Sequence, residues 1–350
     1  MAGLYLRPEG LVYGAAARDA VTSGAAGWLA GSAVAFTSCE VLEGKIQNPV
    51  RQLLPFSKLK GIRDQTLREQ LSWLTEPRDP IAGIDWEKTR IMGIVNVTPD
   101  SFSDGGHYLN AQSAIAHGTY LRHCGADILD VGGESTRPGA EAVSRREEQA
   151  RVVPVIEELG QGSVPVSVDT RNARLMRLVL GKGADIINDV SALTHDDDAL
   201  GVVALSGCPV VLMHARGEPE TMQDEPRYEN VLLEVYRYLE ERIEACLTAG
   251  MERSSIIVDP GIGFGKTLDH NLVLLRNLGL FHGLGCVVLL GASRKRFIGE
   301  LTGETLPDQR VPGSLAAVFQ AALQAVQIVR VHDVAQTAQC LAVAEAILQE

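Results

Sequence analysis

The chain has 350 residues, enough for one large or two medium domains, and its composition, 45% hydrophobic and 22% charged, is typical of a folded globular protein. The formal net charge of −12 argues against nucleic acid or an anionic membrane surface as a partner, because both need a basic footprint. An anionic ligand would therefore need a local basic site.

Redox and targeting signals favour the cytoplasm. The six cysteines lie far apart, without a Cys-x-x-Cys pair or zinc-type spacing, so we expect reduced thiols. The longest apolar stretch near the N-terminus, residues 25–36, is too short and too rich in small residues to cross a bilayer, and no basic segment precedes it. We expect neither a signal peptide nor a membrane anchor.

Residues 1–88 are predicted to form a small N-terminal extension domain. Pro77 and Pro80 lie in a stretch rich in residues that break helices and strands, which is typical of the boundary between two domains. Upstream lie Gly/Ala-rich patches and an amphipathic segment, residues 58–74, with roughly helical spacing of its apolar positions. Nothing in this part carries recognisable chemistry, so its role stays open.

Residues 89–350 show a regular alternation of short apolar runs and amphipathic segments. Continuous apolar, β-branched runs suit parallel strands that are buried on both faces. Eight such runs are present, at residues 90–96, 128–131, 164–168, 186–188, 210–213, 256–258, 287–290 and 328–331. Eight units in this length predict an α/β fold, a (β/α)8 TIM barrel. The alternative, an open doubly wound sheet, usually has fewer strands and a Gly-rich phosphate turn after the first strand, which is absent.

Polar residues follow almost every predicted strand. The first strand ends at Asn96 within IMGIVNVTPDSFSDGG, and similar clusters follow the others. A single cluster could be a turn or a helix cap, since Asn, Asp, Pro and Gly also serve turn geometry. A barrel, however, brings all these strand ends to one rim, where its active sites lie. We therefore predict a catalytic site there.

The rim residues fall into two chemical groups. One group can read the polar edge of a flat heterocycle, and it comprises Asp169, Asn188, Asp259 and Lys295. The other group suits phosphate oxygens, and it comprises Thr136, Arg137, Arg330 and His332. Asn96, with Asp100 and Asp104 nearby, offers hard oxygen ligands for a Mg²⁺ that keeps most of its waters and bridges to a diphosphate.

Two nucleotide-binding motifs can be set aside. Residues 260–267 superficially resemble a phosphate-binding loop, but Pro260 stands where that motif needs its first glycine. Lys266 stands where the dinucleotide fingerprint needs its third glycine. In the basic cluster after the seventh strand, we expect Lys295 to contact ligand and Arg296 to lie at the surface.

The motifs together resemble those of dihydropteroate synthase, a pterin-binding family. The resemblance covers residues from about 90 to 350, in the family's order. It rests on IMGIVNVTPDSFSDGG, DVGGESTRPGA, SVDT, NDVSA, VLMHARG, DPGIGFGKT, GASRKRFIG and RVHDV. It implies a TIM barrel that condenses 6-hydroxymethyl-7,8-dihydropterin diphosphate with 4-aminobenzoate to form 7,8-dihydropteroate and pyrophosphate in folate synthesis. It also implies Mg²⁺ as cofactor, a homodimer and competition by sulfonamides.

The resemblance assigns roles to single positions. The residues that match the family's contacts to the pterin edge are Asp169, Asn188, Asp259 and Lys295. Met213 would line the ring, and Arg330 would stack on it. The residues that match the family's diphosphate contacts are Thr136, Arg137, Arg330 and His332. Asn96 matches the residue next to the metal. Phe102 and Pro138 would wall the aminobenzoate pocket, and Ser293 would lie near its carboxylate.

The implied mechanism is electrostatic. Pyrophosphate leaves first, and the dihydropterin delocalises the cation that remains at the methylene carbon. The residues expected to act in catalysis are Asp104, Arg137, Lys295, Arg330 and His332. Asp104 would face the cation, and no protein nucleophile is required.

Two other functions fit a pterin-binding barrel. Corrinoid-linked methyl transfer from methyltetrahydrofolate would share the pocket of Asp169, Asn188 and Asp259 but would not need an anion site, whereas this chain carries one. A degenerate barrel acting as a scaffold would have lost rim residues, and none of the matched ones is missing.

Overall fold

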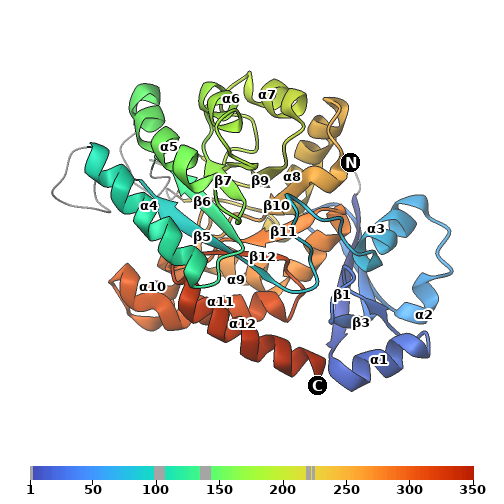
Figure 1. Ribbon diagram of the computed structural model, residues 1–350. Helices are drawn as coiled ribbons and strands as arrows, with labels where there is room; N and C mark the ends of the chain where they lie inside the picture. The colour runs from blue at the N-terminus through green and yellow to red at the C-terminus, as the bar shows by residue number, and fades with distance from the viewer. Residues whose placement is uncertain (1–2, 98–106, 135–142, 218–221, 223–224) are drawn as a thin grey trace.

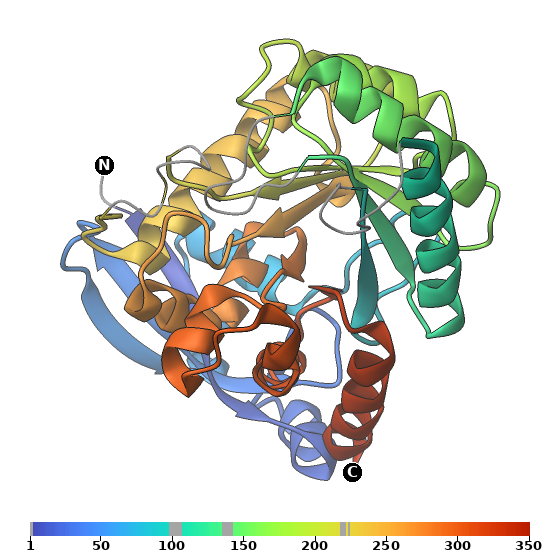
Figure 2. The same cartoon turned by 90° about the vertical axis from the view of Figure 1, so that its left-hand side faces the viewer.

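The computed structural model describes residues 3–97, 107–134, 143–217, 222 and 225–350, with the side chains of residues 107–110 excepted. Eight parallel strands close into a barrel in the order β10-β11-β12-β5-β6-β7-β8-β9 (Figures 1 and 2). They are β5 (Arg90–Asn96), β6 (Ile128–Gly132), β7 (Val166–Asp169), β8 (Ile186–Asp189), β9 (Val210–Met213), β10 (Ile256–Asp259), β11 (Val287–Leu290) and β12 (Ile328–Val331). The predicted TIM barrel is confirmed.

Helices connect the strands and cover the outside of the barrel (Figure 1). They are α4 (His107–His123), α5 (Arg145–Leu159), α6 (Ala173–Leu180), α7 (Ala199–Ser206), α8 (Val231–Thr248), α9 (Leu268–Arg276), α10 (Arg296–Thr302), α11 (Val311–Ala322) and α12 (Val334–Gln349), with short 3₁₀ segments η2 (Arg253–Ser255), η3 (Leu278–Leu284) and η4 (Pro307–Arg310). Polar caps fix several starts: Ser144, Asn230 and Thr267 accept backbone N–H groups at the beginning of α5, α8 and α9.

The strand side chains alternate between two buried layers. One set packs under the helices, and the other fills the barrel interior in a cluster that includes Met92, Ile128, Ile186, Ile257 and Ile328. Because side chains repeat their direction every second residue, the positions two residues further along these strands also face inward. This alternation places the predicted polar residues above an apolar floor.

The N-terminal extension is an antiparallel sheet with three short helices. Its elements are β1 (Gly3–Val12), α1 (Gly14–Thr22), β2 (Gly27–Trp28), β3 (Ala35–Gly44), β4 (Val50–Pro55), α2 (Phe56–Leu59) and α3 (Gln65–Thr75). β1 pairs with one edge of β3, while β2 and β4 pair with the other. The predicted amphipathic segment, residues 58–74, with roughly helical spacing, contains the end of α2 at Leu59 and a new helix, α3, that Asp64 caps and that begins at Gln65.

The extension packs closely on the barrel (Figure 1). Its apolar core continues into Ala325 and Leu348 of the barrel, and the ring of Tyr5 meets that of Tyr236 edge-on at 5.2 Å. Ile81 and Trp86, in the connecting segment, join the apolar cluster at the floor of the barrel interior. The predicted division at residue 88 stays a prediction, since the two parts share their apolar contacts. Among the described helices, none has the length and hydropathy needed to cross a bilayer.

Candidate active site

Asp259 ends β10 inside the barrel and is almost fully buried. Its Oδ1 accepts the N–H of Gly261 at 2.7 Å, and burial raises its pKa although Lys295 acts in the opposite direction. A Cβ added to Gly291 would lie 3.4 Å from Oδ2 of Asp259 and 3.9 Å from Nζ of Lys295. The carboxylate and the ammonium therefore border the same space.

Lys295 is held by the segment that follows β10. Its Nζ donates to the carbonyl of Ile262 and lies 4.5 Å from the centre of the Phe264 ring, a cation–π contact. Burial lowers the pKa of Lys295 to about 8, partly offset by the charge of Asp259. The ammonium is thus oriented before any ligand arrives.

A second charged group lies on β12, the strand next to β11. Arg330 of β12 donates from Nε to Oδ2 of Asp130 at 2.6 Å and from Nη2 to Oδ2 of Asp169 at 2.8 Å. Asn188 donates from Nδ2 to the same Asp130 oxygen at 3.1 Å. Burial raises the pKa of Asp169 to about 7, against the opposing charge of Arg330. The guanidinium of Arg330 thus donates hydrogen bonds to two carboxylates.

The second carboxylate oxygen of Asp130, Oδ1, is available to a ligand. The side chain is fully buried, and within the described part of the chain Oδ1 has no hydrogen-bond partner. Leaving a buried acceptor unpaired costs about 1–3 kcal/mol, so a ligand N–H at this oxygen would recover free energy. Asp130 is therefore well suited to bind the donor edge of a polar ring.

The described rim residues predicted for the pterin do come together. Adjacent strands carry Asp169 and Asn188 in register, and likewise Asp259 and Met213. All four side chains are buried. With Lys295 and Arg330 they border the carboxyl end of the barrel, a face of acceptors and donors with an apolar side at Met213.

Ser293 and His332 form a separate pair. The hydroxyl of Ser293 accepts the backbone N–H of His332 at 3.2 Å and lies 3.0 Å from its Nδ1. Next to them Arg294 and Asp333 form an ion pair with distances of 2.9 and 2.5 Å. Arg296 extends outward, 74% exposed, and pairs with Glu300, as expected for a surface residue.

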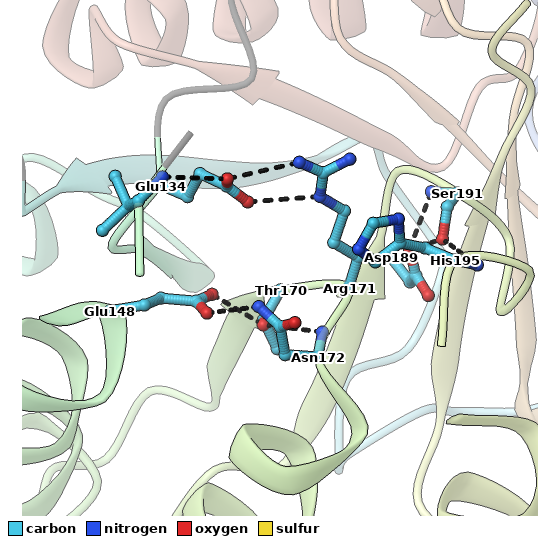
Figure 3. Close-up of polar contacts among 9 residues, drawn as sticks. Glu134, Glu148, Thr170, Arg171, Asn172, Asp189, Ser191 and His195 are labelled. Carbon is cyan, nitrogen blue, oxygen red and sulfur yellow. Dashed lines mark hydrogen bonds and ion pairs between the residues drawn. The ribbon is translucent and has the colours of Figure 1, made fainter. Parts of the chain in front are cut away.

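Other polar residues near these strand ends are structural (Figure 3). Buried Glu148 of α5 accepts from the hydroxyl of Thr170 at 2.7 Å and from Nδ2 of Asn172 at 2.5 Å, which fixes the chain directly after Asp169. Asp189 accepts the N–H of Ser191 at 2.7 Å and so shapes a turn rather than a ligand site.

Glu134 and Arg171 link the connections after β6 and β7 (Figure 3). Nε and Nη2 of Arg171 each lie 3.2 Å from a carboxylate oxygen of Glu134. The geometry is bidentate, the most directional form of a guanidinium–carboxylate pair. This pair thus holds the two connections together beside the barrel mouth.

The remaining predicted positions divide into two classes. Asn96 ends β5 at the rim, half-buried and in register with Gly132. The others lie outside the described residues, and they are Asp100, Phe102, Asp104, Thr136, Arg137 and Pro138. The assignments of all these residues to substrate or metal stay predictions.

Comparison with known proteins identifies the family. A family model described as "Pterin binding enzyme" matches residues 92–332. The dihydropteroate synthase of Neisseria meningitidis is 51% identical over 270 residues, which cover 75% of this chain and 94% of that relative. The chain belongs to the dihydropteroate synthase family of pterin-binding enzymes. The predicted family and activity are thereby confirmed.

Solved structures of dihydropteroate synthases agree. That of Xanthomonas albilineans with 4-aminobenzoic acid has a TM-score of 0.73 and 50% identity, covering 78% of this chain and 98% of its own. The same synthase in complex with 7,8-dihydropteroate has a TM-score of 0.70 and 47% identity, with 77% and 98% covered. The family model begins at residue 92 and so leaves the extension unmatched.

Two residues of the candidate site were not predicted from the sequence. Asp130 lies inside a strand rather than after one, and its only signal was a charge in the middle of an apolar run. Phe264 lies in the run of residues 260–267 that superficially resembles a phosphate-binding loop, and its ring gave no separate signal.

Proposed function

We propose that the enzyme condenses 6-hydroxymethyl-7,8-dihydropterin diphosphate with 4-aminobenzoate at the face bounded by Asp259, Lys295, Arg330 and Asp130. The observation that carries this proposal is the buried Oδ1 of Asp130, which has no hydrogen-bond partner among the residues that the structure describes and lies within a ring of buried acceptors. The relatives bound to 4-aminobenzoic acid and to 7,8-dihydropteroate support the choice of substrates.

The buried carboxylates and Asn188 would orient the pterin by its ring N–H groups. Such groups exclude analogues that lack the matching donors, because an unpaired acceptor would remain. Lys295 would donate to a ring acceptor, and Met213 would pack against the ring face. Binding would thus fix the direction in which the exocyclic methylene points.

Charge separation is the chemical problem once the pterin is bound. The diphosphate leaves as an anion, and the dihydropterin stabilises the methylene cation until the arylamine attacks it. His332 lies on the rim beside Ser293 and would donate to phosphate oxygens. Arg330 is already paired with two carboxylates, so its role in holding the ring's position has better structural support than its role in holding diphosphate.

We propose Mg²⁺ as the cofactor, near Asn96. Among the described residues, no group of three or more His, Cys, Asp or Glu side chains could form a metal cage. A single amide oxygen fits a cation that keeps most of its waters, as Mg²⁺ does. When bound, the ion would neutralise charge on the diphosphate.

We further propose a homodimer in the cytoplasm. Val343 and Ile347 lie one helical turn apart on α12 and are 61% and 54% exposed, which gives an apolar strip for a second copy. The six cysteines are all unpaired, as suits a reducing compartment. Sedimentation equilibrium of the wild type and of Ile347→Glu would test the dimer, since the charge should shift the protein to monomer.

The direct test is an assay of purified protein with both substrates and Mg²⁺. We expect 7,8-dihydropteroate and pyrophosphate in equal amounts. Pterin binding without product would contradict the synthase reaction and favour a binding role. Methyl transfer from methyltetrahydrofolate to a corrinoid would favour the related methyltransferase reaction.

A further inference from the structure

Lys266 is a lysine buried beneath the rim, with only 2% of its surface exposed. Its Nζ lies 2.8 Å from the carbonyl oxygen of Gly261, 3.0 Å from that of Phe264 and 3.2 Å from that of His214. It also lies 2.8 Å from Nδ1 of His214. The three carbonyls can only accept, so Lys266 joins the segment after β10 to the end of β9 through donated hydrogen bonds.

Two glycines let these segments approach closely. Gly261 has a φ of 68°, and a Cβ there would lie 1.9 Å from the carbonyl oxygen of His214. Gly265 has a φ of 62°, and a Cβ there would lie 2.2 Å from the carbonyl oxygen of Arg216. Neither position tolerates a side chain without backbone movement. The segment of residues 261–265 is therefore pressed against residues 214–216, with Lys266 fastening it.

The fastened segment supplies two contacts to Lys295. The carbonyl of Ile262 accepts from its Nζ, and the ring of Phe264 lies below the ammonium. A Cβ on Gly263 would lie 3.1 Å from Cδ of Lys295, so the stem of that lysine also runs along this backbone. Any movement of residues 261–265 would therefore change where the ammonium of Lys295 lies.

We propose that Lys266 is a positioning residue for the pterin site, which it serves by fixing the segment that orients Lys295. The proposal rests on the proposed function, because it takes Lys295 as a contact to the dihydropterin. The Nζ of Lys266 already donates to the carbonyl oxygens of Gly261, Phe264 and His214, so it is not available to touch substrate itself. Burial also lowers the pKa of Lys266 well below its usual value, which shows the cost of keeping a lysine at this place.

A merely structural lysine would affect stability alone. The test is therefore a double-mutant cycle on pterin affinity with Lys266→Met and Lys295→Met. The dissociation constant for 6-hydroxymethyl-7,8-dihydropterin diphosphate is measured by calorimetry without the second substrate. We expect Lys266→Met to raise it about tenfold in the wild-type background and less than twofold in the Lys295→Met background.

The control is Lys182→Met, which removes an exposed lysine paired with Glu157 and should leave affinity unchanged. Equal losses in both backgrounds, or unchanged affinity with a lower melting temperature, would overturn the proposal. If Lys266→Met does not fold, Lys266→Gln, which keeps two donors, enters the same cycle with a smaller expected coupling. A wild type that binds pterin but forms no dihydropteroate would contradict the proposed reaction and leave this cycle interpretable.

Discussion

Arg330 and Asp130 meet inside the barrel, where Nε of the arginine donates to Oδ2 of the carboxylate at 2.6 Å. The contact matters because Arg330 has a second partner in Asp169, so two anions set the plane of one guanidinium. Loss of the charge of either neighbour would weaken the attraction that holds the arginine in place. The charged face of the site is thus a small network rather than a set of independent contacts.

Asp130→Asn should disturb this network while keeping the shape of the side chain. The free energy of unfolding is expected to fall by about 2 kcal/mol, because Arg330 loses a charged partner. kcat/KM is expected to fall about 100-fold, since a misplaced guanidinium shifts the pterin. Urea unfolding and steady-state kinetics measure the two effects. Asp85→Asn, the same change at a partly exposed pair with Arg90, is the control, and equal effects of both would contradict the network.

Pterin affinity should depend on pH through Lys295. Its pKa is lowered to about 8, so the ammonium is present below pH 8 and is lost as the pH rises through that value. We expect the dissociation constant for the pterin substrate to rise about tenfold per pH unit well above pH 8, a range distinct from the one around the pKa of Asp169, about 7. Calorimetric titrations over this range measure it. The rise should disappear in Lys295→Met, and its persistence there would assign it to another group.

Removal of Mg²⁺ should abolish turnover reversibly. Dialysis against EDTA is expected to remove most activity and added Mg²⁺ to restore it, because the ion neutralises the departing diphosphate. Asn96→Ala should raise the Mg²⁺ concentration for half-maximal rate about tenfold, the loss of one modest ligand. Asn48→Ala removes an exposed side-chain amide in the N-terminal extension and is the control. An EDTA-treated enzyme with full activity would rule out the ion.

Arg78 should stabilise the extension on the barrel without affecting catalysis. It donates to the carbonyl oxygens of Trp73, Glu76, His282 and Cys286, at 2.6 to 3.1 Å, and burial lowers its pKa to about 10. Arg78→Met should lower the free energy of unfolding by about 3 kcal/mol, because buried carbonyls lose charged donors.

kcat should stay within twofold in that variant, since η3 precedes β11 and lies at the amino end of the strands. Arg18→Met, which removes one exposed hydrogen bond to the carbonyl of Gln349, is the matched control. Equal destabilisation by the two substitutions would contradict a special role for Arg78.

The barrel strands were predictable because each is a short, largely apolar run and polar residues follow almost every one. Four of the eight, β5, β9, β11 and β12, have the predicted bounds; β6, β8 and β10 each extend one residue further, and β7 differs at both ends, by two residues and by one. The strands of the N-terminal extension were harder to predict from the sequence. Its strands β1 and β3 contain charged residues such as Arg7 and Glu40, which pair with each other at 2.8 Å across the sheet. A local pattern cannot show such a partner in advance.

The candidate site was predictable where side chains follow strands, and less so elsewhere. Asp169, Asn188 and Asp259 stand at strand ends, and the structure gathers them. Asp130 and Lys266 were missed because their importance comes from three-dimensional contacts: an arginine from the last strand and carbonyls from neighbouring loops. Spacing in the sequence carries no signal for either.

The pairing of Arg330 with Asp130 and Asp169 also sets the order in which the enzyme can become functional. These contacts span 200 and 161 residues, and β12 closes the barrel by pairing with β5. Long-range closure of this kind is slow and comes late in folding. During synthesis on the ribosome, the pterin site cannot exist until the final strand has emerged, so recovery of pterin binding after dilution from denaturant would report barrel closure itself.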